Sequence, residues 1–229
     1  GGGSESLYDA GSMVKSLSSA KFPGKSAKHS WLIEFYAPWC GQCQKLTPTW
    51  EKMPQALKGV AKVGAVNCDD EANADLCAKE GVQSYPTIKF VKAGGRGTEE
   101  FAETPSVKSL HAFALEHLPS EVVNLRTSTH LEDFKAGPLA KATSGCAAIL
   151  LTDKFETSPL YMSLSAHYYP ALAFGEARAS NTKLGSILGV SSFPTLVLLC
   201  GEEITTYDGE LKSEPLEEFL GKASKKKRR

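Results

Sequence analysis

Two cysteines three residues apart, Cys40 and Cys43 in "FYAPWCGQCQKL", are the residues of this sequence best suited to chemistry. Such a pair can form a redox-active dithiol, supply half of a zinc site, or be two inert core thiols. An apolar strand is expected over 31–36, and a helix is expected to begin just after Cys40. The unpaired N–H groups and positive dipole of a helix N-terminus favour a thiolate, so Cys40 is the expected nucleophile. Cys43 follows one turn later, where it can resolve a mixed disulfide on Cys40.

Composition and motif content exclude several other classes of function. Zinc requires four ligands, and the sequence holds neither a second CxxC nor an HxxxH, so no metal and no other cofactor is expected. The 26 basic and 26 acidic residues cancel, which gives no indication of nucleic acid or an anionic membrane. The sequence contains no apolar run of about 18 residues, so no membrane span is expected. The basic run "KASKKKRR" that ends the chain is interpreted as a solvated tail, with nuclear targeting or nucleic-acid contact as the alternative.

Two pairs of segments repeat along the chain. "GVQSYPTIKFVKAGG" at 81–95 aligns without a gap with "GVSSFPTLVLLCGEE" at 189–203, an offset of 108 residues. "WLIEFYAPW" at 31–39 aligns with "AAILLTDKF" at 147–155, an offset of 116 residues. A period of about a hundred residues is too long for a solenoid repeat and indicates a duplicated small domain.

Strands and helices alternate within each copy. A strand, a helix and a second strand predict parallel pairing with a right-handed crossover, and a later hairpin adds an antiparallel pair. In the first copy we expect a weakly helical stretch at 11–20 and a helix over 41–58 that Pro48 and Pro54 interrupt, with a kink at Pro48. The boundary is expected near Pro119, where a helix ends before a new strand. The resulting division is 1–118, 119–222 and a basic, disordered tail at 223–229.

The motifs of the first copy together resemble those of the protein disulfide isomerases, within the thioredoxin superfamily. The resemblance rests on "EFYAPWCGQC", on Glu34 six residues before the first cysteine, and on "YPT" at 85–87. It is strong to about residue 118 and weaker beyond. It implies an α/β protein of two tandem thioredoxin-like domains, each a mixed central sheet flanked by helices. The first domain is then catalytic, and the second, which has "SFPTLVLL" but no dithiol, is redox-inactive.

The resemblance also implies roles for single residues. Glu34 matches a buried carboxylate that exchanges a proton with Cys43, although the strand pattern alone also allows an exposed charge. Pro86 matches a cis-proline opposite the dithiol, which leaves the backbone of Tyr85 free to pair with an extended substrate. Trp39 matches an aromatic residue beside the nucleophile, but it could equally be plain core.

Three positions depart from the family pattern. Gly41 and Gln42, between the cysteines, are expected to tune the site, and Gln42 stands where isomerases usually have histidine. A neutral amide stabilises a thiolate less than an imidazole does, which predicts a milder oxidant. A lysine that often partners the buried glutamate is Ala65 here, and an arginine brought toward the dithiol aligns loosely with His117.

Four further cysteines form two candidate disulfides. Cys68 should end a strand and Cys77 should lie on the next helix, a short connection of a kind that recurs in isomerase-type domains. Cys146 and Cys200 map by the two offsets onto strands that are antiparallel neighbours in this fold, so they should face each other. For Cys68 and Cys77 the alternatives are a pair that modulates the active site and two buried free thiols. "FETS" at 155–158 is expected to be the second domain's counterpart of the dithiol motif.

The resemblance implies a thiol–disulfide oxidoreductase and isomerase that forms and rearranges disulfides in folding secretory proteins. The expected partners are unfolded or misfolded proteins with cysteines, and glutathione or an upstream thiol oxidase, with no nucleic acid and no membrane. The expected location is the lumen of the endoplasmic reticulum, although the sequence contains neither signal peptide nor retention signal. The alternatives are a thioredoxin-like dithiol reductant and a substrate-binding chaperone with secondary redox activity.

Overall fold

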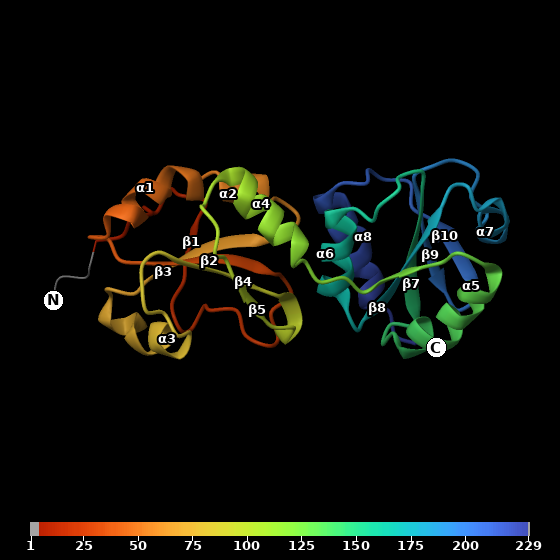
Figure 1. Cartoon of the computed structure of the whole chain (residues 1–229). Helices are drawn as coiled ribbons and strands as arrows, with labels where there is room; N and C mark the ends of the chain where they lie inside the picture. The colour runs from red at the N-terminus through yellow and green to blue at the C-terminus, as the bar shows by residue number, and fades with distance from the viewer. Residues whose placement is uncertain (1–4, 229) are drawn as a thin grey trace. The chain divides into compact units, whose positions relative to one another are not determined.

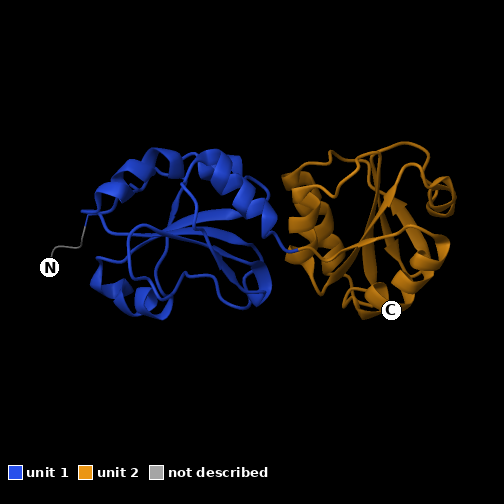
Figure 2. Ribbon diagram, viewed as in Figure 1, with its two compact units in different colours: residues 1–119 blue, residues 120–229 orange. Residues whose placement is uncertain are grey.

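A computed structural model describes residues 5–228 of the chain. The chain divides into two compact units, residues 1–119 and 120–229 (Figure 2). Each unit contains a five-stranded sheet with both parallel and antiparallel pairs, and helices cover both faces of each sheet (Figure 1). This arrangement confirms the predicted α/β class with two mixed sheets flanked by helices.

The sheet of the first unit has the order β1-β3-β2-β4-β5. Its central strand pairs in parallel with β3, as the strand–helix–strand pattern predicts, and antiparallel with β4. The predicted hairpin adds the antiparallel pair of β4 and β5. Helices α1, α2 and α4 cover one face, and α3 covers the other (Figure 1). The elements are β1 (Lys15–Ser16), β2 (Trp31–Tyr36), α1 (Gly41–Trp50), α2 (Met53–Ala56), β3 (Lys62–Asn67), a 3-10 turn (Glu71–Asn73), α3 (Ala74–Lys79), β4 (Thr87–Val91), a second 3-10 turn (Ala93–Gly95), β5 (Thr98–Glu100) and α4 (Val107–Glu116).

The second unit repeats this plan, with the sheet order β10-β9-β7-β8-β6. Helices α6 and α8 lie on one face of its sheet, and α5 and α7 lie on the other (Figure 1). The elements are β6 (Val122–Asn124), α5 (Ser128–Phe134), a π-helical turn (Lys135–Leu139), β7 (Cys146–Thr152), α6 (Pro159–Tyr168), β8 (Leu172–Arg178), α7 (Thr182–Leu188), β9 (Thr195–Cys200), β10 (Glu203–Thr206) and α8 (Ser213–Ser224).

The core of the first unit explains why the strand before the dithiol is rigid. Strand β2 reads WLIEFY and is buried from Leu32 onward, because helices cover both of its faces. Trp50 at the end of α1 is fully buried, and its indole N–H donates to the carbonyl of Gly64 at 3.2 Å. The strand and the helix that flank the dithiol are therefore both anchored in the core.

The structure corrects one local expectation from the sequence and shifts the boundaries of two others. Residues 11–20 form no helix; β1 adds instead to the sheet edge, where the N–H of Leu17 donates to Ala65 at 2.9 Å. The helix predicted over 41–58 is interrupted, as its two prolines predict, but the break falls between them at 51–52: Pro48 lies inside α1, and Pro54 is the second residue of α2. Helix α8 runs to Ser224, past the expected start of the tail at 223, because Ala223 is buried on its packed face. Residue 229 lies outside the described residues.

Each unit contains one disulfide. Cys68 is bonded to Cys77 across a separation of 9 residues, and Cys146 is bonded to Cys200 across 54 residues. Cys146 and Cys200 are direct partners in the antiparallel register of β7 and β9. The two pairs are those that the sequence suggested.

Removing either disulfide is expected to destabilise its own unit, by an amount that grows with the loop it closes. The unfolded chain regains about 3 kcal/mol of entropy in a Cys68→Ala/Cys77→Ala variant and about 4 kcal/mol in a Cys146→Ala/Cys200→Ala variant. Denaturant unfolding measures the first by tryptophan fluorescence, because all three tryptophans lie in the first unit. Hydrogen exchange measures the second. A larger loss for the shorter loop would contradict this account.

Candidate active site

Cys40 is the N-cap residue of α1, where the chain leaves β2 and turns into the helix. Its Sγ accepts a hydrogen bond from the N–H of Cys43 at 3.3 Å, one of the unpaired donors of the first helical turn. The thiol also lies 3.5 Å from the carbonyl oxygen of Tyr85, to which it donates. The side chain is 8 % exposed, so an approaching sulfur can reach it only from one side. The N–H of Cys43 can therefore donate to this sulfur when negative charge develops on it.

Cys43 occupies the next turn of α1 and is fully buried. Neither it nor Cys40 is in a disulfide in this structure. Burial, followed by the hydrogen bond to Cys40 and the charge of Glu34, raises the pKa of the Cys43 thiol to about 12. At neutral pH this thiol keeps its proton. It can attack another sulfur only after a base has taken that proton.

Glu34 lies in the middle of β2 and is completely buried. Burial raises the pKa of its carboxyl from 4.5 to about 7, although the hydrogen bond from Tyr8 acts in the opposite direction. The hydroxyl of Tyr8 donates to Oε2, whereas Oε1 has no hydrogen-bond partner among the described residues. A carboxyl with this pKa can both accept and return a proton near neutral pH.

Tyr8 is the residue that sequence reasoning missed at this site. Glu34 pairs across the sheet with Ala65, the position that resembles the lysine position of the family pattern. Tyr8 supplies the missing donor from the segment before β1, and its ring packs edge-on against Tyr36 at 5.6 Å between centroids. No periodicity or motif marks this segment, so the pairing could not have been found from the sequence.

Replacing Tyr8 by phenylalanine is expected to raise the pKa of Glu34, because the lost hydrogen bond favours the ionised carboxyl. The loss should cost roughly 2 kcal/mol of stability at pH 8, where Glu34 is ionised, and less at pH 5. Tryptophan fluorescence during denaturant unfolding at both pH values measures the difference. An equal cost at both pH values would show that Tyr8 acts only through packing.

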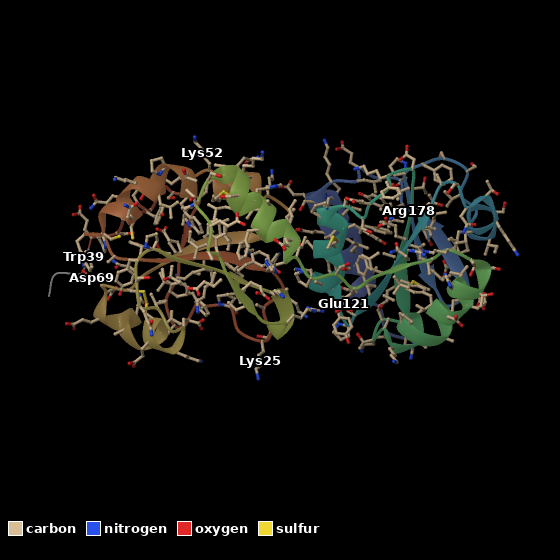
Figure 3. The ribbon with its side chains drawn as sticks, viewed as in Figure 1. Lys25, Trp39, Lys52, Asp69, Glu121 and Arg178 are labelled. Atoms are coloured by element: carbon tan, nitrogen blue, oxygen red, sulfur yellow. A yellow bond between two sulfur atoms is a disulfide. The ribbon has the colours of Figure 1, made fainter. Side chains whose placement is uncertain are left out.

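The loop before β4 forms the opposite wall of the site. The Tyr85–Pro86 peptide bond is cis, and the carbonyl of Tyr85 faces Cys40. Trp39 is 66 % exposed, so it is not part of the core. Its indole N–H donates to Asp69 at 3.0 Å, a pair labelled in Figure 3, and its ring packs edge-on against Tyr85. The exposed tryptophan and the backbone at Tyr85 thus lie side by side next to Cys40.

Asp69 connects this wall of the site to the first disulfide. It follows Cys68 directly, and the bond from Cys68 to Cys77 ties the loop after β3 to α3. The N–H of Asp69 also donates to the side chain of Asn67 at 3.0 Å. The disulfide therefore holds the loop whose carboxylate fixes the indole of Trp39.

Three other sequence-predicted positions make no hydrogen bond to the dithiol that the structure shows. Gly41 and Gln42 are exposed in the first turn of α1, beside Cys40. His117 is the C-cap of α4; its ring packs on Phe113 at 4.8 Å between centroids, and its Nε2 lies 3.9 Å from the carboxylate of Glu116. These contacts hold His117 within its own helix rather than against the dithiol.

The second unit has no thiol at the position that corresponds to the dithiol. The structure places that position a few residues later in the sequence than the strand alignment predicts. Ser158 is the N-cap of α6 and accepts from the N–H of Tyr161, as Cys40 does from Cys43 in α1. The counterpart of the dithiol motif is thus 158–161 and not "FETS" at 155–158. The loop between β7 and α6 is longer than its equivalent in the first unit, which the strand offset alone could not reveal.

Comparison with known proteins agrees with this geometry. Residues 13–116 match the thioredoxin family. A putative protein disulfide-isomerase of Dictyostelium discoideum is 35 % identical over 96 % of this chain and 54 % of its own length. Protein disulfide-isomerase A6 of Mus musculus is 44 % identical over 42 % of this chain and 22 % of its own length. Residues 13–116 are thus a thioredoxin-family domain, and the chain is similar over 96 % of its length to a protein named as a protein disulfide-isomerase. These findings support the predicted family.

A solved structure extends the likeness in fold to the second unit. A crystal structure of ERdj5 superposes on 91 % of this chain and 29 % of its own chain, with a TM-score of 0.66 and 22 % sequence identity. Both units thus have the thioredoxin-like fold of the family. The chain spans about half the length of the Dictyostelium relative, so the activity of the whole protein is treated as a proposal below.

The structure describes neither a metal cluster nor a membrane span. Within residues 5–228, no three side chains of histidine, cysteine, aspartate or glutamate are grouped so that they could hold a metal ion. Over the same residues, every helix is too short or too polar to cross a bilayer.

Proposed function

We propose that this chain is a thiol–disulfide oxidoreductase and isomerase that forms and rearranges disulfides in folding secretory proteins. The observation that carries the proposal is the layered arrangement of Cys40, Cys43 and Glu34. A nearly buried thiol caps a helix, a second thiol of raised pKa lies one turn below it, and a carboxyl with a pKa of about 7 lies buried on the adjoining strand. Nucleophile, resolving thiol and base are then provided by one strand and one helix.

The first step is attack by the Cys40 thiolate on a client disulfide. A bond forms between Cys40 Sγ and one client sulfur, and the client's other sulfur leaves as a thiolate. The N–H of Cys43 stabilises the attacking thiolate, because it donates to Cys40 Sγ at 3.3 Å. Tyr85, Pro86 and Trp39 bind the extended client segment, through the backbone of the cis-proline loop and the exposed indole.

The second step is resolution by Cys43. Glu34 takes the proton of the Cys43 thiol, and the resulting thiolate attacks Cys40 Sγ, which breaks the mixed disulfide and releases the client sulfur as a thiolate. The enzyme is left with a Cys40–Cys43 disulfide and the client is reduced by two electrons. The reverse sequence oxidises a client dithiol. Isomerisation occurs when another client thiolate attacks the mixed disulfide before Cys43 does.

The second unit is proposed to be redox-inactive, because Ser158 stands where the nucleophile stands in the first unit and its two cysteines are bonded to each other. The proposed clients are unfolded or misfolded proteins that contain cysteines. Glutathione or a thiol oxidase is proposed to reoxidise the dithiol. The lumen of the endoplasmic reticulum is the proposed location, since two structural disulfides suit an oxidising compartment.

The redox potential of the Cys40/Cys43 pair tests the proposal directly. Equilibration with glutathione should give a value between about −180 mV, typical of an isomerase, and about −270 mV, typical of thioredoxin. The protein should also restore activity to scrambled ribonuclease. A potential at the thioredoxin end without refolding of ribonuclease would favour a dithiol reductant. If a Cys40→Ser/Cys43→Ser variant no longer refolds ribonuclease but still protects unfolded clients from aggregation, a chaperone would be favoured.

Gln42 offers a matched variant for this measurement. It is exposed in the first turn of α1, so Gln42→His can place a partly positive imidazole beside the Cys40 thiolate without disturbing the core. We expect the potential to become more oxidising in this variant, because the reduced, thiolate form is stabilised. Glutathione equilibration of both proteins side by side gives the sign. An unchanged potential would show that residue 42 does not tune the redox potential of the dithiol.

A further inference from the structure

Glu34 and Cys43 exchange a proton in the proposed cycle, yet both side chains are fully buried. A turnover that reduces a client leaves the proton of the Cys43 thiol on Glu34. A turnover that oxidises a client requires Glu34 to supply that proton, because Cys43 then leaves as a thiolate. In either direction Glu34 must exchange a proton with solvent before the next turnover, although it has no contact with solvent.

A line of hydroxyl groups leads from Glu34 toward the surface. The hydroxyl of Tyr8 donates to Oε2 of Glu34, but Tyr8 is itself only 3 % exposed. The hydroxyl of Tyr8 has a second side-chain partner, the hydroxyl of Thr47. Thr47 lies on α1 at a half-buried position. The line that begins at Glu34 therefore ends at a residue that solvent can reach.

Thr47 can direct its hydroxyl hydrogen to two acceptors. It lies one helical turn after Cys43 and donates to the carbonyl oxygen of that residue at 3.0 Å. The oxygen of Tyr8 is the other acceptor. A hydroxyl hydrogen rotates to suit its partners. When the hydrogen of Thr47 turns to Tyr8, the donors point inward from Thr47 through Tyr8 to Glu34, and when both hydroxyls turn the other way they point outward.

Tyr8 can pass a proton on only if it accepts another at the same time. Burial, followed by the charge of Glu34, raises the pKa of Tyr8, so its hydroxyl stays neutral. Burial also raises the pKa of Tyr36 and, to about 12, that of Cys43. Glu34, with a pKa of about 7, is thus the group of this set that changes its charge near neutral pH.

The segment that carries Tyr8 has contacts that hold it in place. The hydroxyl of Ser6 donates to the carbonyl of Tyr8 at 2.8 Å, and the N–H of Tyr8 donates back to Ser6 Oγ at 3.1 Å. Ser6 Oγ also lies 3.0 Å from the hydroxyl of Tyr36, a residue of β2. These contacts fix the ring of Tyr8 so that its hydroxyl bridges Glu34 and Thr47.

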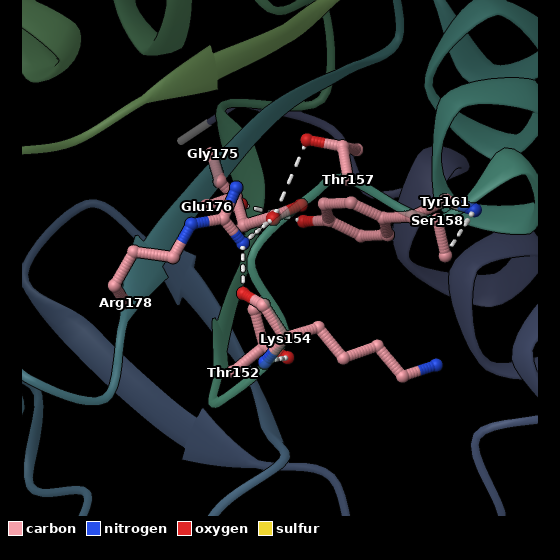
Figure 4. A network of polar contacts seen from close by, with 8 residues as sticks. All are labelled: Thr152, Lys154, Thr157, Ser158, Tyr161, Gly175, Glu176 and Arg178. Carbon is pink, nitrogen blue, oxygen red and sulfur yellow. Dashed lines mark hydrogen bonds and ion pairs between the residues drawn. The ribbon is translucent and has the colours of Figure 1, made fainter.

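The second unit satisfies its buried carboxylate in a different way. Glu176 on β8 is 1 % exposed. It accepts from Nη1 of Arg178 and, at 3.3 Å, from the hydroxyl of Thr157 (Figure 4). A guanidinium keeps its protons and balances the carboxylate as a fixed charge. Glu34 has a neutral hydroxyl as its donor instead, and a hydroxyl can accept a proton as well as give one. The unit with the dithiol is therefore the one whose carboxyl has a partner suited to proton transfer.

We propose that Tyr8 and Thr47 form a hydroxyl relay that carries protons between Glu34 and solvent. In the outward direction Glu34 gives its proton to the oxygen of Tyr8, Tyr8 gives its own hydrogen to the oxygen of Thr47, and Thr47 gives its own to water. As many O–H bonds form as break, and neither hydroxyl is left charged. The relay rests on the proposed function, because it serves Glu34 as the base, and both hydroxyls are positioning groups that act through Glu34.

A titration followed by NMR, with the side-chain carboxyl carbons of glutamate labelled, tests the relay. The resonance of Glu34 is the one that Glu34→Gln removes. Its shift with pH gives the pKa, and its line width at the midpoint gives the rate of proton exchange. Thr47→Val keeps the shape of the side chain and removes the hydroxyl. We expect an unchanged midpoint and an exchange rate lowered about tenfold or more, because the proton has lost its path.

Three matched variants make the result specific. Thr47→Ser keeps the hydroxyl and should keep the parental exchange rate. Thr49→Val makes the same change at another half-buried position of α1, outside the relay, and should also keep it. Tyr8→Phe should slow the exchange and raise the midpoint, because Tyr8 both relays the proton and donates to Glu34. A parental exchange rate in Thr47→Val, a shifted midpoint without slower exchange, or equal slowing in Thr49→Val would overturn the proposal.

This titration needs neither a client nor glutathione, so it separates the relay from the proposed function. If the parental protein refolds scrambled ribonuclease and Thr47→Val exchanges the Glu34 proton at the parental rate, the relay alone is wrong. If the parental protein does not refold ribonuclease and Thr47→Val still slows the exchange, the relay is correct and the oxidoreductase function is wrong. Tryptophan fluorescence during denaturant unfolding verifies that each variant is folded.

Discussion

Replacing Cys40 by serine is expected to lower the rate of disulfide exchange by roughly a thousandfold or more, to the level of the reaction without enzyme. A serine hydroxyl at the helix N-terminus can accept the N–H of Cys43, so the fold should survive. It cannot form a mixed disulfide, however, and the remaining thiol of Cys43 is fully buried with a pKa of about 12. The rate of refolding of scrambled ribonuclease measures the loss.

Cys43→Ser is the matched control for this prediction, because it keeps the nucleophile and removes the resolving thiol. The variant should attack client disulfides and then remain attached to them, which non-reducing gel electrophoresis detects as a covalent complex. Cys40→Ser should form no such complex. If the two variants trapped clients equally, the assignment of Cys40 as the nucleophile would be wrong.

Replacing Glu34 by glutamine is expected to slow the resolution step by about a hundredfold or more at pH 7, because the Cys43 thiol loses its base. The same change should stabilise the fold at high pH. Burial raises the pKa of Glu34 from 4.5 to about 7, so the folded state binds its proton more tightly than the unfolded state does. The contribution of Glu34 to stability is thus fully present below about pH 4.5. It is lost as the pH rises through 7.

The size of this effect follows from the pKa difference, and it amounts to about 3 kcal/mol between acid pH and pH 8. Glu34→Gln should remove the pH dependence, since an amide does not titrate and its oxygen can still accept from Tyr8. Tryptophan fluorescence during denaturant unfolding at pH 5 and pH 8 gives the free energy of unfolding of the first unit. A variant that resolves mixed disulfides at the parental rate would exclude Glu34 as the base.

The chemistry-bearing residues could be predicted because each is marked within a short string. Glu34 lies in β2, and Cys40 and Cys43 lie at the start of α1 just after it. Pro86 directly precedes strand β4. Strand β2 could be recognised because both of its faces are buried and its residues are almost all apolar. Local pattern and tertiary structure agree at these positions.

The remaining features depend on contacts between distant segments. Residues 15–16 form a strand because the edge of β3 offers hydrogen bonds, and nothing in their own sequence shows that edge. Ser158 takes the place of the nucleophile in the second unit because the loop before α6 is longer, and two aligned strands do not fix the length of a loop. The contact between Thr47 and Tyr8 could be found only from coordinates, since it joins α1 to a segment before β1.

The place of Tyr8 in the chain changes what counts as the smallest working unit. The match to the thioredoxin family begins at residue 13, so a fragment trimmed to that match would keep the sheet, the dithiol and Pro86 but not Tyr8. Such a fragment could fold and still titrate differently, because Glu34 would lose its hydroxyl donor. The protonation of Glu34 is thus set partly by a segment that lies outside the residues matched to the thioredoxin family.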